Sequence, residues 1–192
     1  MNIVIFLIVC GSLVLLFMQR QGKLPFARSK AKLSPSQRNV FNLEIGDIVQ
    51  YDGVDWFVEG KLIYNTDSYN WFEYLLRDND DILWLSVEED DIVEVSVLKE
   101  VDIPEINSSP PKAIAYQDIE YRLADSGTAT ALRLGNTLNR QAQKFQYYDY
   151  KSSSFHRMSV EIWNGQPEIT VGRKINPRML NFLPGDGQKV YG

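Results

Sequence analysis

Hydrophobic and polar residues alternate with a period of two along most of the chain after residue 41. In one such run, Val54, Trp56 and Val58 fall on the same face. This alternation is typical of half-buried β-strands. Turn-forming pairs such as Asp52-Gly53 and Asn164-Gly165 separate the runs, so the pattern predicts antiparallel hairpins. Later runs with the same pattern are 113–123, 128–134, 143–150, 155–163 and 167–175.

One stretch departs from this pattern. Thr128 to Gln143 could form a helix, although Gly135 and several β-branched residues disfavour it. The segment 102–112 is rich in proline and serine and reads as an internal linker.

The first eighteen residues are different again. Ile3 to Met18 carries no charge, which predicts an uncleaved transmembrane helix, since Gln19-Arg20-Gln21 offers no small-residue cleavage site. A helix of that length spans about 24 Å, against about 30 Å of bilayer hydrocarbon. Basic residues follow the segment and are expected to lie at the membrane surface: Arg20, Lys23, Arg28, Lys30 and Lys32.

Positive flanks stay on the cytoplasmic side. We therefore expect a single-pass protein of the inner membrane, or of an internal photosynthetic membrane, with its amino terminus outside and its body in the cytoplasm. The bilayer would be contacted through residues 3–18.

The sequence thus predicts a mainly β fold: one N-terminal transmembrane helix, then two similar antiparallel β units, as small barrels or a sandwich, packed together. The expected segments are an anchor (1–18), a basic flexible tether (19–42), a first β unit (43–101), a linker (102–112), a second β unit (113–183) and a tail (184–192).

The two predicted units resemble each other in three ordered matches. The segment 49–56 matches 114–121, the segment 72–74 matches 148–150, and the segment 85–88 matches 158–161. These matches pair Glu73 with Asp149, and Glu88 with Glu161. An internal duplication or chance recurrence of short β motifs would both account for them.

Charge is distributed unevenly between these segments. The whole chain has a formal net charge of −5. Residues 1–40 hold six basic residues and no acidic one, whereas residues 41–112 hold four basic and 18 acidic residues, a net of −14. A nucleic-acid-binding protein would present a basic domain instead, so nucleic acid is not an expected partner.

Few residues offer catalytic or metal chemistry. The one histidine, His156, lies on an apolar strand face, and the one cysteine, Cys10, lies in the predicted anchor. No metal site and no cofactor are therefore expected. The remaining candidates are carboxylates, and Glu73 with Asp149 could divide acid and base roles if they converge.

Large apolar side chains occupy both faces of the run 71–76 and of the strand after it. Either both faces are buried between the units, or one is a recognition surface. The candidate partner-binding residues are Trp56, Trp71, Trp84, Glu88, Glu89, Asp90 and Asp91.

Several spaced positions together resemble an uncharacterised bacterial family, domain of unknown function 4178, over residues 43–183. They include Gly46-Asp47-Ile48-Val49, Trp56-Phe57-Val58-Glu59-Gly60, Trp71-Phe72-Glu73-Tyr74 and Val160-Glu161-Ile162-Trp163. The resemblance implies an accessory protein in a membrane context and brings no catalytic residues.

We therefore expect a membrane-anchored adaptor whose β-rich body binds a protein partner in membrane-complex assembly or maintenance. Two alternatives stay open: an enzyme using Glu73 and Asp149, or a small-ligand-binding β-barrel.

Overall fold

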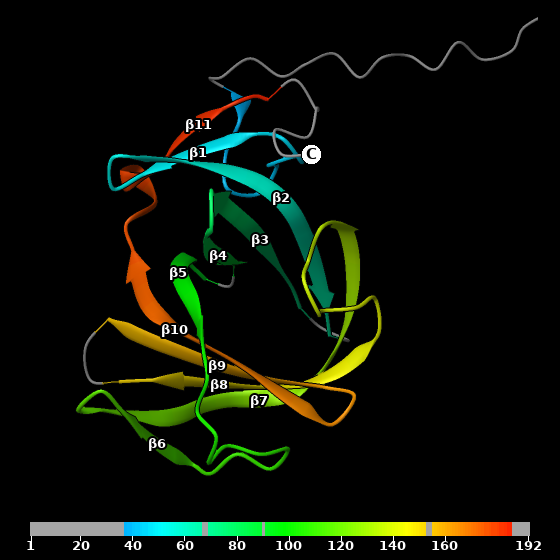
Figure 1. Ribbon diagram of the computed structural model, residues 1–192, viewed down its shortest axis with the longest axis vertical. Coiled ribbons are helices and arrows are strands. Elements are labelled where there is room, and N and C mark those ends of the chain that lie inside the picture. The colour runs from blue at the N-terminus through cyan, green and yellow to red at the C-terminus, as the bar shows by residue number, and fades with distance from the viewer. Residues whose placement is uncertain (1–36, 67–68, 90, 153–154, 186–192) are drawn as a thin grey trace, which may run out of the picture. The chain divides into compact units, whose positions relative to one another are not determined.

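The computed structural model describes residues 37–66, 69–89, 91–152 and 155–185 (Figure 1). These residues are mainly β, as predicted. The elements in chain order are β1 (Ile48–Tyr51), β2 (Val54–Asn65), β3 (Asn70–Asp78), β4 (Asp81–Glu89), β5 (Val93–Val101), β6 (Ala113–Tyr116), β7 (Ile119–Gly135), β8 (Lys144–Lys151), β9 (His156–Trp163), β10 (Gln166–Ile175), the 3₁₀ turn η2 (Pro177–Met179) and β11 (Asn181–Leu183).

The strands form one antiparallel sheet that closes on itself. Its order is β11-β1-β2-β3-β4-β5-β10-β9-β8-β7-β6, and β2 also pairs with β7. This last pairing closes eight strands, β2 to β5 and β7 to β10, into a barrel. The short strands β1 and β11 extend the sheet outside β2, and β6 extends it beyond β7 (Figure 1).

The sheet order reads the same from either side of the β5–β10 seam. Each half is a meander of five strands that opens with a short hairpin. The two opening turns, Asp52-Gly53 and Gln117-Asp118, both have positive φ at their two central residues, the conformation that tight hairpins of this hand require. The internal matches in sequence therefore fall on equivalent strands.

The predicted pair of separate β units is nevertheless wrong. Neither half closes by itself, because each contributes four strands to the one barrel. The seams β5–β10 and β2–β7 supply the backbone hydrogen bonds that an isolated half would leave unpaired along its edges.

Close backbone approach at the β2–β7 seam explains two glycines. Gly60 pairs with Gly135 across the seam. A Cβ on Gly60 would lie 1.6 Å from the carbonyl oxygen of Asn136, and one on Gly135 would lie 2.3 Å from that of Glu59. Any side chain here would force the two halves apart.

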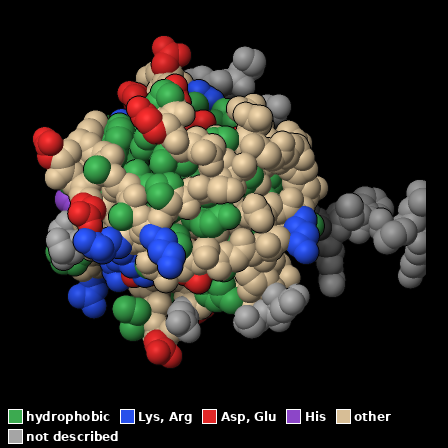
Figure 2. All heavy atoms as spheres, turned by 90° about the horizontal axis from the view of Figure 1, so that it is seen from below, with side chains coloured by type: hydrophobic (Ala, Val, Ile, Leu, Met, Phe, Trp, Pro, Cys, Tyr) green, Lys and Arg blue, Asp and Glu red, His purple; other side chains and the backbone are tan. Residues whose placement is uncertain are grey.

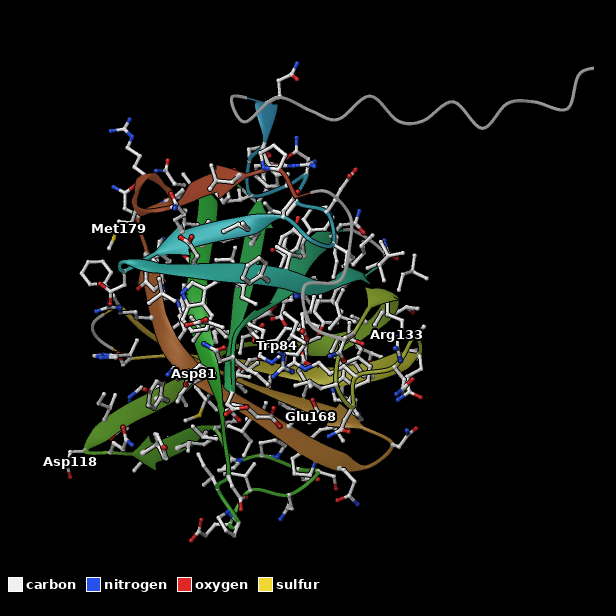
Figure 3. All side chains as sticks on the ribbon, turned by 45° about the horizontal axis from the view of Figure 1, so that its top comes forward. Asp81, Trp84, Asp118, Arg133, Glu168 and Met179 are labelled. Atoms are coloured by element: carbon white, nitrogen blue, oxygen red, sulfur yellow. The ribbon has the colours of Figure 1, made fainter. Side chains whose placement is uncertain are left out.

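The barrel wall separates three apolar cores, which explains why its strands are apolar on both faces. Inside the barrel, Trp71, Leu75 and Trp84 pack together. Outside β2 to β5, Tyr74 and Leu76 pack beneath β1 and the segment 40–45. A third core lies outside β8 to β10. Figure 3 shows Trp84 and Glu168 where side chains converge in the middle of the view, and Asp118, Arg133 and Met179 at its edge.

The prediction of a transmembrane helix is corrected. None of the residues that the structure describes forms a helix long and apolar enough to cross a membrane. The segment 1–18, on which the prediction fell, lies outside the described residues, and its apolar run is short for a bilayer. The described residues therefore give no support to the predicted single-pass membrane location.

The predicted helix near Thr128–Gln143 is also corrected, because β7 continues to Gly135 and residues 136–143 form a loop. Of the predicted tether, residues 19–36 lie outside the described part of the chain, whereas the buried Arg38 pairs with Asp47 and Val40 joins the outer core. The predicted membrane-surface residues Arg20 to Lys32 are not described.

Candidate functional site

A cavity of about 620 Å³ extends from one end of the barrel interior as far as Glu73 and Glu161, which pair with Arg140. We call that end the cavity end; it lies where the connection 66–69 joins β2 to β3. Six carboxylates from six different strands line the cavity: Glu73, Glu88, Glu94, Asp125, Asp149 and Glu161. Each stands on the inward face of its strand, which the pleat brings round at every second residue.

The opposite end of the barrel is filled by the loop 136–143 between β7 and β8, and we call it the plugged end. The hydroxyl of Thr137 donates to the carbonyl oxygen of Arg140 at 2.8 Å, and both residues are fully buried. The loop thereby sends the Arg140 side chain into the barrel, where its guanidinium lies 4.1 Å from the ring centre of Trp84.

Arg140 is the central cation of the plugged end. It forms ion pairs with Glu73, with Glu161 (3.2 Å) and with Glu168 (3.1 Å). It also donates to the hydroxyl oxygen of Tyr64 at 3.2 Å. Three carboxylates from three strands thus share one guanidinium, whose several donors fit such a cluster.

Burial raises the pKa values of these carboxyl groups, and Arg140 opposes the rise. Glu161 has a pKa of about 7, because burial and the neighbouring Glu73 raise it more than Arg140 lowers it. The pKa of Glu73 is also raised by burial. At neutral pH the plugged end is therefore a partly protonated network held by a single arginine.

At the cavity end, Glu94 is fully paired. Arg157 and Lys174 each contact one of its carboxylate oxygens at 2.7 Å. Although burial raises the pKa of Glu94, these hydrogen bonds lower it to about 2. Glu94 is therefore ionised and neutralised.

Glu88 and Asp149 lack such partners. Among the described residues, no basic side chain lies within 4.0 Å of either carboxylate. Asp149 accepts one hydrogen bond from the Ser159 hydroxyl at 2.8 Å. Burial and the neighbouring Glu88 raise the pKa of Asp149 to about 8, and burial raises that of Glu88. Lys151 and Arg157 also line the cavity and lower the pKa of Glu88 from a distance. The cavity end therefore holds two carboxyl groups that have no directly bonded cation among the described residues.

Aromatic rings line the same part of the cavity. Trp71 stacks on Tyr69 with ring centres 5.6 Å apart, and meets Tyr147 edge to face at 5.4 Å. Trp71 is also the direct cross-strand neighbour of Glu88. The Tyr147 hydroxyl donates to Asp125, which lies exposed at the rim. Flat apolar faces thus adjoin the unpaired carboxylates.

The structure brings together the predicted acid–base pair, because Glu73 and Asp149 line one cavity. It does not place the candidate tryptophans on the surface: Trp71 and Trp84 lie inside the barrel and Trp56 lies in the outer core. Glu89 and Asp91 are exposed, and Asp90 lies outside the described residues. On the outer face drawn in Figure 2, hydrophobic side chains form small separate groups.

Sequence reasoning missed Arg140 altogether. It stands in a stretch with helical character, and a single arginine near a glycine and an asparagine reads as an ordinary loop residue. The signal that was available is the length of this connection, eight residues between equivalent strands that elsewhere need four.

The arrangement can bind charge and can exchange protons. No group of three or more His, Cys, Asp or Glu side chains that could hold a metal ion occurs among the described residues. The aromatic faces and unpaired carboxylates instead suit an organic cation.

Fold and cavity together define a closed antiparallel β-barrel with an acidic interior. By sequence the chain belongs to the family called domain of unknown function 4178, whose family model matches residues 44–177. It is 32% identical over 150 residues to an uncharacterized protein of Mycobacterium tuberculosis, covering 72% of this chain and 70% of that protein. It is 24% identical over 160 residues to an uncharacterized protein of Aquifex aeolicus, covering 77% and 86%. No solved structure matches.

Proposed function

We propose that this protein binds a small organic cation inside its barrel. The observation that carries the proposal is the cavity of about 620 Å³, in which Glu88 and Asp149 face a ligand-sized space and no basic side chain of the described residues lies within 4.0 Å of either carboxylate. Volumes of about 300–1,000 Å³ are usual for small-molecule sites.

Electrostatics favour a positive ligand over a neutral one. A cation beside Glu88 and Asp149 would relieve the repulsion between them, and in a partly dehydrated space that attraction is weakly screened. Without a ligand, one way to reduce the repulsion is to hold a proton on Asp149, in keeping with its pKa of about 8.

The other functions expected from the sequence are less well supported. Glu73 is held by Arg140 and Tyr64, which restricts it as a catalytic acid or base. The protein-partner role remains a prediction, and the burial of its three candidate tryptophans removes the anchors on which it relied.

Titration calorimetry of the full chain with butylammonium and with neutral 1-butanol tests the proposal. We expect butylammonium to bind and 1-butanol to bind at least about tenfold more weakly, since charge-assisted hydrogen bonds contribute about 1.5–3 kcal/mol. Glu88→Gln should weaken butylammonium binding, whereas Glu89→Gln, its exposed neighbour on β4, should not. Equal binding of the two compounds, or no binding of any cation, would reject the proposal.

A further inference from the structure

The internal repeat of the barrel relates its two ends. The sequence matches make Glu73 equivalent to Asp149, and Glu88 equivalent to Glu161. The order of strands in the sheet repeats in the same way. At the β5–β10 seam Leu98 pairs with Gly172. Because equivalent strands run antiparallel there, the relation exchanges the ends of the barrel.

The same carboxylates therefore occur twice, once at each end. At the plugged end they are Glu73, Glu161 and Glu168. At the cavity end their counterparts are Asp149, Glu88 and Glu94. Glu94 lies four residues before Leu98, and Glu168 lies four residues before Gly172, which pairs with Leu98.

The cations do not repeat. At the plugged end Arg140 pairs with all three carboxylates. At the cavity end Arg157 and Lys174 pair with Glu94 alone. The connection equivalent to the Arg140 loop is residues 66–69, Thr-Asp-Ser-Tyr, which is shorter and contains no basic residue. Arg157 and Lys151 also line the cavity, but neither lies within 4.0 Å of the Glu88 or Asp149 carboxylate, and no other basic residue of the described part of the chain does.

We propose that a guanidinium group of the bound ligand pairs with Glu88 and Asp149, as Arg140 pairs with their counterparts, and lies against Trp71 and Tyr147. This rests on the proposed function and specifies its ligand class.

Three features favour guanidinium over a simple ammonium. The two carboxyl groups stand on β4 and β8, which are not neighbours in the sheet, and a planar group with five donors can reach both. Guanidinium stacks on aromatic faces, and Trp71 and Tyr147 line the cavity beside these carboxylates. The chain itself uses this combination once, since Arg140 lies over Trp84 while pairing with the plugged-end carboxylates.

The test compares butylguanidinium with butylammonium by titration calorimetry of the full chain. We expect butylguanidinium to bind about tenfold more tightly. Tyr147→Leu should remove most of this preference, whereas Tyr147→Phe, which keeps the ring, should retain it. Binding of both cations with equal affinity, or a preference for butylammonium, would overturn the guanidinium assignment and leave the proposed cation site standing. Binding of neither would reject both.

A second variant uses the repeat itself. In Arg140→Ala the plugged end should become a second guanidinium site, so the stoichiometry of butylguanidinium should rise from one to two and its addition should raise the melting temperature more than in the unaltered protein. An unchanged stoichiometry in a folded Arg140→Ala would contradict the equivalence of the two ends. The comparison of the two cations on the unaltered protein does not depend on this variant folding.

Discussion

The two ends of the barrel carry the same carboxylates and differ in what neutralises them. At the plugged end, Arg140 enters from the loop 136–143 and pairs with Glu73 and Glu161. At the cavity end, their counterparts Asp149 and Glu88 have no basic partner among the described residues and face open space. The loop 136–143 therefore neutralises one copy of the repeated carboxylate cluster, and the other copy is available for binding.

The difference teaches how a symmetrical barrel acquires a single site. A buried charge pair is costly to break because the surviving partner is left uncompensated. The plugged end cannot lose its arginine without that cost, whereas the cavity end avoids it by keeping a proton on Asp149, whose pKa is about 8.

The largest effect on stability should come from removing the positive charge of Arg140. Arg140→Met should lower the free energy of unfolding by about 3–5 kcal/mol, because it leaves the buried Glu73 and Glu161 and the half-buried Glu168 uncompensated. The loss should be smaller at pH 5 than at pH 8, since protonation relieves the repulsion. Urea unfolding measures it. Arg133→Met, at an exposed arginine bonded to Gln141, is the control and should change stability by less than about 0.5 kcal/mol.

At the cavity end, removing a charged group should raise the free energy of unfolding instead of lowering it. Between pH 4 and 8 folded Asp149 holds a proton that the unfolded chain releases, so its contribution to stability falls as pH rises through this window. Asp149→Asn removes this dependence and should raise the free energy of unfolding at pH 8 by about 1–3 kcal/mol, because the amide has no charge to bury. Thermal unfolding at pH 5 and pH 8 measures it. A loss of stability at pH 8 would contradict the unpaired state of Asp149.

Cation binding should be coupled to the same proton. Several groups surround Asp149: Asp125 on β7, Glu88 on β4, Glu73 on β3, Arg157, Ser159 and Glu161 on β9, and Tyr147 and Lys151 on β8. Since the cation favours the ionised carboxylate, affinity should rise by up to about tenfold per pH unit between pH 6 and 7, and level off above pH 8.

Calorimetry of butylguanidinium in buffers of different ionisation enthalpy should accordingly show release of about one proton at pH 6. Asp149→Asn should abolish the release. Proton uptake on binding in the unaltered protein would be the opposite of what this arrangement requires.

The smallest effect distinguishes two tyrosine hydroxyls. Tyr64 is fully buried and its hydroxyl contacts Arg140, Glu73 and Glu161. Tyr64→Phe should therefore cost about 1 kcal/mol. Tyr147→Phe loses only a hydrogen bond to the exposed Asp125 and should change stability by less than about 0.5 kcal/mol. Equal losses would mean that the two ends are equally dependent on their polar networks.

The local pattern of the sequence determined the strands and the tight turns, and it contained the three internal matches. Period-two alternation located β2 to β5 and the later strands, and Asp52-Gly53 and Asn164-Gly165 adopt the positive φ angles that such turns need. These features depend on residues close in the chain. The exception was residues 128–143, where pairing of β7 with β8 and β2 overrides a weak helical tendency.

Only the tertiary structure decided that the two halves share one barrel and that Glu73 and Asp149 share one cavity. Matching the two halves by sequence shows that two residues are equivalent. It does not show whether each half closes into its own barrel or both halves close into one. That choice depends on the backbone hydrogen bonds of the β2–β7 seam and on the close approach that Gly60 and Gly135 permit. The role of Arg140 was equally hidden, because only the folded loop carries it into the barrel, where burial makes its single charge decisive.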